Sequence, residues 1–126
     1  MLIIRDEQAE AFLVPVDDDF RKWVAIHLEQ FFPDQCAQLG ARAIDDVVEY
    51  GIQRAKLYAI HDQANVCAYL NLMFVLGRDF DAAPHLPWAG AILGDKSIAS
   101  ASARTERLHG ESMRYLRRLA DNQAEQ

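Results

Sequence analysis

The most informative stretch of this chain for its fold is Val66-Cys67-Ala68-Tyr69-Leu70-Asn71-Leu72-Met73-Phe74-Val75-Leu76. Asn71 interrupts an otherwise apolar run, so apolar side chains would surround nearly the whole circumference of a helix. A helix of this kind is buried on most sides. Asp62 is suited to cap its first turn, and Gly77 to end it. We therefore predict a buried central helix at about residues 62–77, with the other helices packed around it.

Amphipathic helices are predicted on the N-terminal side of this segment. Residues 6–13 form a short helix ended by Pro15, and a longer one follows the aspartates at 17–19, whose charge suits a helix N-terminus. A short helix from Asp34 ends at Gly40. The longer helix carries the stripe Phe20, Trp23, Val24, Leu28, Phe31 and Phe32, which we assign mostly to the core, and Pro33 ends it.

A helix over residues 41–59 has Gly51 on its apolar face, beside Ile44, Val48 and Ile52. Glycine costs about 1 kcal/mol inside a helix. A neighbouring helix that passes close by would explain its presence.

The sequence of the C-terminal third predicts an irregular stretch and two more helices. Residues 77–87 form the irregular stretch, and Pro87 opens a short helix that Gly94 ends. A last helix covers about 97–120, and Gly110 makes it the helix expected to move most. The chain is therefore predicted to be all-α: one domain over residues 1–126, a compact bundle of about five to six helices.

Charge is unevenly distributed along these 126 residues, whose net charge is -6. Residues 1–95 hold 7 Lys/Arg against 15 Asp/Glu, whereas residues 96–120 hold 6 against 2. An acidic body repels phosphates, so we expect no nucleic-acid partner. No stretch reaches the roughly 20 apolar residues of a membrane span. Arg5 and Asp6 follow the opening apolar residues too soon for a secretory signal, so the expected location is cytoplasmic.

No pattern of catalytic or metal-binding residues is visible in the sequence. The histidines at 27, 61, 85 and 109 lack the spacing of ligands on one helix face, and Cys36 and Cys67 form no Cys-x-x-Cys motif. His27 lies on the apolar stripe, which favours a hydrogen-bonded core histidine. We expect no catalytic residues, no bound metal and no cofactor, hence a protein that is not an enzyme.

Candidate partner-binding residues lie in and just after the irregular stretch: Asp79, Phe80, Asp81 and Trp88. An exposed aromatic side chain rimmed by carboxylates is a suitable anchor for a basic or amphipathic segment of another protein. A structural interpretation stays open beside this one. In it, Phe80 plugs the core, the aspartates cap backbone N–H groups and pair with Arg78, and Trp88 pins the loop to the core.

Several segments resemble a family of small helical proteins encoded beside type VI secretion effectors, spike proteins and loading adaptors in Gram-negative bacteria. The similarity covers residues 1–94, and Ala59 stands where the resemblance implies glycine. The matching segments are Ile3-Ile4-Arg5-Asp6-Glu7-Gln8, Phe32-Pro33 with Cys36, Gly51-Ile52-Gln53-Arg54-Ala55 with Tyr58 and Ile60, Leu72-Met73-Phe74-Val75-Leu76-Gly77-Arg78-Asp79-Phe80-Asp81, and Leu86-Pro87-Trp88-Ala89.

This resemblance implies an accessory role without catalysis, as an adaptor or co-chaperone that holds an effector with its loading chaperone before secretion. The expected partner is therefore a protein, namely the effector or its adaptor chaperone. An immunity protein that blocks a toxin is the main alternative. A small enzyme or metal protein that uses Asp79 and Asp81 is a third hypothesis.

Overall fold

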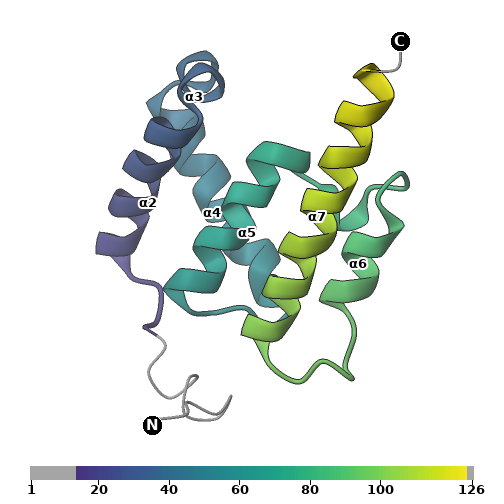
Figure 1. The fold of residues 1–126 in the computed structure, drawn as a ribbon. Coiled ribbons are helices and arrows are strands. Elements are labelled where there is room, and N and C mark those ends of the chain that lie inside the picture. The colour runs from purple at the N-terminus through teal and green to yellow at the C-terminus, as the bar shows by residue number, and fades with distance from the viewer. Residues whose placement is uncertain (1–13, 125–126) are drawn as a thin grey trace, which may run out of the picture.

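The computed structural model describes residues 14–124, and this part of the chain is all-α, as predicted (Figure 1). Within it there is no strand, and Pro15 and Asp62 form an isolated antiparallel bridge. The helix predicted at 6–13 lies outside the described residues. The helices are α2 (Asp18–Phe31), α3 (Pro33–Leu39), α4 (Ala41–Leu57), α5 (Gln63–Leu76), α6 (Pro87–Leu93) and α7 (Ala101–Ala124), with the 3-10 turn η1 (Phe80–Ala82) before α6.

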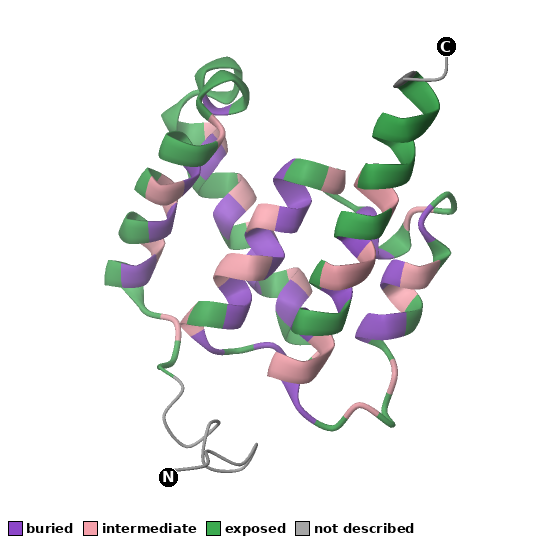
Figure 2. Cartoon of the chain, in the orientation of Figure 1, coloured by how far each residue is buried: buried purple, intermediate pink, exposed green. Residues whose placement is uncertain are grey.

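Helix α5 is the central element, as its apolar sequence predicts. It packs between α4 and α7 and also contacts α2 and η1. The Asp62 carboxylate accepts a hydrogen bond from the Asn65 backbone N–H at 2.9 Å, and Gly77 ends the helix with a φ of 120°. Buried residues are concentrated on α5 and on the helix faces turned toward it (Figure 2).

Gly51 is the point of closest approach between α4 and α5. A Cβ added there would lie 2.8 Å from the Met73 sulfur and closer still to a terminal methyl group of Leu70. The close contact with a neighbouring helix that this glycine predicted is confirmed.

The last helix, α7, begins and ends about four residues later than predicted. Its start is shifted because the Asp95 carboxylate accepts hydrogen bonds from the N–H and hydroxyl groups of Ser97, which holds that segment in a turn. The Ser100 hydroxyl then caps the helix by accepting from the Ala103 N–H at 2.9 Å. Gly110 does not interrupt the helix. The greater mobility expected of α7 stays a prediction.

None of the helices described is both long enough and apolar enough to cross a membrane.

Candidate protein-binding groove

Phe80 and Asp81, two of the four candidate partner-binding residues, are enclosed by the fold. The Phe80 side chain is 1% exposed, and its ring packs on Tyr69 with centroids 5.0 Å apart. The Asp81 carboxylate is fully buried. Neither side chain is accessible to a partner in this structure, because both fasten the segment after α5 to the core.

Asp81 is the centre of a polar cluster that joins η1 to α4. Its carboxylate accepts a hydrogen bond from the Tyr58 hydroxyl at 2.5 Å and forms an ion pair with Arg54. Burial and this hydrogen bond raise the pKa of Tyr58 to about 12. The hydrogen bond to Asp81 also raises the pKa of Arg54, so both partners keep their protons at neutral pH. The cluster therefore stabilises the packing of η1 against α4.

Asp79 lies on the surface and accepts a hydrogen bond from the Tyr50 hydroxyl. The predicted pairing of the aspartates with Arg78 is wrong. The guanidinium of Arg78 instead stacks over the ring of Tyr50, 4.0 Å from its centroid, because Asp79 and Asp81 already have partners on α4.

Trp88, the fourth candidate residue, is half-buried. Its ring packs against Tyr115 of α7 with centroids 5.9 Å apart, so it helps to hold α6 on α7. Partner binding by Asp79 and Trp88 stays a prediction, whereas direct contact by Phe80 and Asp81 requires this loop to open.

The most exposed aromatic residues are instead on α2. Trp23 is 55% exposed and Phe31 is 66% exposed, so these two residues of the stripe lie outside the core. Their rings stack on either side of His27, with centroid distances of 5.2 Å and 4.6 Å. His27 is half-buried and hydrogen-bonds with Asn71 Oδ1 of α5 at 3.0 Å. Its predicted hydrogen bond is therefore confirmed, while its burial is only partial.

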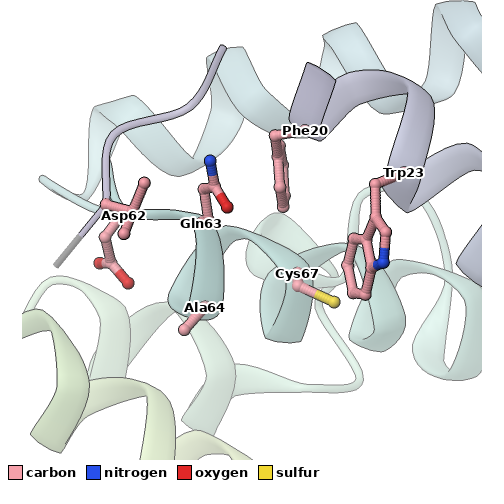
Figure 3. A pocket seen from close by; sticks show the side chains of 7 residues that line it. Phe20, Trp23, Asp62, Gln63, Ala64 and Cys67 are labelled. Carbon is pink, nitrogen blue, oxygen red and sulfur yellow. The ribbon is translucent and has the colours of Figure 1, made fainter. Parts of the chain in front are cut away.

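A cavity of about 510 Å³ opens where the first turns of α2 and α5 meet (Figure 3). Phe20 and Trp23 project into it from α2, and Cys67 faces them from α5. Burial raises the pKa of the Cys67 thiol, so this side chain is a neutral part of the wall. The complete lining is Val14, Phe20, Trp23, Asp62, Gln63, Ala64 and Cys67.

Beyond the cavity, exposed rings of α2 continue along the junction of the two helices. The two helices run side by side in the same direction, because Phe20 meets the start of α5, His27 meets Asn71, and Phe32 stacks on Phe74 near its end. We call this surface the α2–α5 groove and define it by Phe20, Trp23, His27 and Phe31 on α2 and by Ala64, Cys67, Asn71 and Val75 on α5.

The α2–α5 groove combines a cavity at one end with exposed aromatic side chains along α2. From Phe20 to Phe31 it extends for roughly 16 Å, about three helical turns. Its exposed rings are those of Trp23 and Phe31, with the His27 imidazole between them. Asp18 and Asp19 lie exposed at the end where α2 begins. Among residues 14–124 no three His, Cys, Asp or Glu side chains converge in a geometry that could hold a metal ion. This arrangement can bind a side chain or a helix face.

Comparison of the chain with models of protein families, with curated proteins and with solved structures finds no match.

Proposed function

We propose that this protein is a non-enzymatic binding protein that holds an apolar helix face of another protein in the α2–α5 groove. The observation that carries the proposal is the exposure of Trp23, which lines the 510 Å³ cavity, and of Phe31 further along α2. Large aromatic side chains at the edge of a pocket are typical centres of binding energy. An amphipathic helix in an apolar groove is a recurring mode of peptide recognition, anchored by residues three and four apart.

For the partner we propose a type VI secretion effector or its loading adaptor, held by this chain as a cytoplasmic adaptor or co-chaperone. The resemblance of residues 1–94 to accessory proteins of such systems supports this part of the proposal. An adaptor needs a surface that stays exposed after its own core has folded. The α2–α5 groove meets this requirement, because α2 buries Phe20, Val24 and Leu28 while Trp23 and Phe31 stay exposed.

Capture of partners from the native host tests the proposal. The tagged chain and its Trp23→Ser and Phe31→Ser variants are used as baits, and the bound proteins are identified by mass spectrometry. The matched control is Leu57→Ser, since Leu57 is 68% exposed at the end of α4, away from the groove. We expect an effector or adaptor to bind the native chain and the Leu57→Ser variant, and to be lost from both groove variants.

Retention of the partner by both groove variants would contradict the assignment of the groove. The partner class has a separate test, in which the chain is expressed alone together with the captured effector. An adaptor leaves the toxicity of that effector unchanged. Rescue of the cells would instead support the alternative function, immunity to a toxin.

A further inference from the structure

The C-terminal end of α7 extends past its neighbours α5 and α6 (Figure 1). All residues from Arg117 to Gln123 are exposed. Met113, Leu116 and Leu119 recur at intervals of three, so together they cover about 120° of the circumference of this segment. Because Met113 is 48% and Leu119 is 41% exposed, this apolar stripe continues past the part of α7 that the bundle covers. We call residues 113–124 the α7 extension.

The other face of the α7 extension is basic. Arg114, Arg117 and Arg118 lie there, and Arg114 pairs with Glu111. Within residues 14–124, Arg117 and Arg118 form no ion pair with an acidic side chain. The extension is therefore an amphipathic helix with an uncovered apolar stripe and two available guanidinium groups.

The α2–α5 groove is the complement of this extension in length, polarity and charge. The extension is roughly 16 Å long, which equals the distance from Phe20 to Phe31 along the groove. Its apolar stripe suits the exposed rings of Trp23 and Phe31. Its arginines suit the exposed carboxylates of Asp19 and of Asp18, which also pairs with Arg21. Helix α7 lies on the far side of α5 from α2, so α5 separates the extension of one molecule from α2 of the same molecule (Figure 1).

We propose that the α7 extension of a second copy of this chain occupies the α2–α5 groove. If each copy inserts its extension into the other, the exchange closes into a symmetric dimer with two equivalent contacts. The inference rests on the groove proposed above as a docking surface. It adds that dimerisation regulates access of a partner to that surface. In the dimer both grooves are filled, so a partner helix binds only by displacing the extension.

Sedimentation equilibrium of the full-length chain tests the proposal. We expect a monomer–dimer equilibrium that weakens as salt rises, since exposed charges contribute to it. Trp23→Ser removes the centre of the groove, and Leu119→Asp places a charge on the apolar stripe of the extension. Each is expected to raise the dimer dissociation constant about 30-fold or more, whereas Leu57→Ser leaves it unchanged. Circular dichroism verifies that each variant keeps its helices.

Mixing the two damaged variants gives the most specific readout. A Trp23→Ser molecule still has an intact extension, and a Leu119→Asp molecule still has an intact groove. Their mixture therefore forms a heterodimer with one working contact, whereas a dimer of either variant alone has none. Formation of this heterodimer supports the exchange of extensions. A native chain that stays monomeric at high concentration, or a dimer unaffected by Trp23→Ser, would overturn it.

The outcome for the dimer is separable from the outcome for the proposed function. If partner capture depends on Trp23 but the chain never dimerises, only the proposed self-association is overturned. Dimerisation through the groove, with no effector or adaptor captured, leaves the self-association standing and contradicts the proposed function.

Discussion

Replacement of Gly51 by alanine has two effects of opposite sign on the free energy of unfolding. Alanine is favoured over glycine inside a helix by about 1 kcal/mol. The added Cβ would lie 2.8 Å from the sulfur of Met73, however, and would overlap the buried side chain of Leu70. Overpacking of this kind costs about 1–3 kcal/mol. We therefore expect Gly51→Ala to lower the free energy of unfolding by up to about 2 kcal/mol.

Gly110 provides the matched control for this prediction. It lies in the interior of α7, and an added Cβ would meet no atom within 4 Å. Gly110→Ala should therefore raise the free energy of unfolding by about 1 kcal/mol. Urea denaturation followed by circular dichroism measures both variants. Equal stabilisation by both substitutions would refute the close approach of α4 and α5 at Gly51.

Three further predictions concern the turn after α4 and the cluster around Asp81. Ala59 has a φ of 58°, which is costly for a residue with a Cβ, so Ala59→Gly should raise the free energy of unfolding by about 0.5–1 kcal/mol in urea denaturation. Asp81→Ala leaves Arg54 partly buried without its partner and should cost about 3 kcal/mol, while the exposed Asp79→Ala should cost less than about 1 kcal/mol in the same assay. Burial and the hydrogen bond to Asp81 raise the pKa of Tyr58 from 10.0 to about 12. The unfolded chain therefore loses this proton first, and the melting temperature should fall between about pH 10 and pH 12, less steeply in Tyr58→Phe.

The sequence predicts the helices well because their ends are set by local chemistry. The Asp62 cap and the Gly77 stop depend on residues within one turn of each helix end. The position of α5 at the centre follows from its nearly uniform apolar content. Gly51 indicates a contact with a distant residue, because glycine destabilises a helix unless the close approach of a neighbouring element offsets that cost. The turn at Ala59 has no such local signal, because alanine disfavours the φ of 58° that it adopts there.

The groove could not be predicted, because two stripes on α2 have the same spacing. Phe20, Val24 and Leu28 recur at intervals of four and are buried, while Trp23, His27 and Phe31 recur at the same interval and border solvent. Periodicity shows that side chains share a face, but it does not show whether another helix covers that face. The one available signal was the combined width, since the six residues of two adjacent stripes exceed what the contacts of α2 with α3, α4 and α5 bury.

The most distinctive sequence motif, residues 77–81, has a structural explanation at almost every position. Gly77 adopts a positive φ, Phe80 fills the core, and Asp81 binds Arg54 and Tyr58. A motif with unusual composition is therefore a weak guide to the binding surface when each side chain is already occupied inside the fold. Exposed aromatic residues without such a role, above all Trp23 and Phe31, are a better guide, because burying them against a partner releases water at no cost to the core.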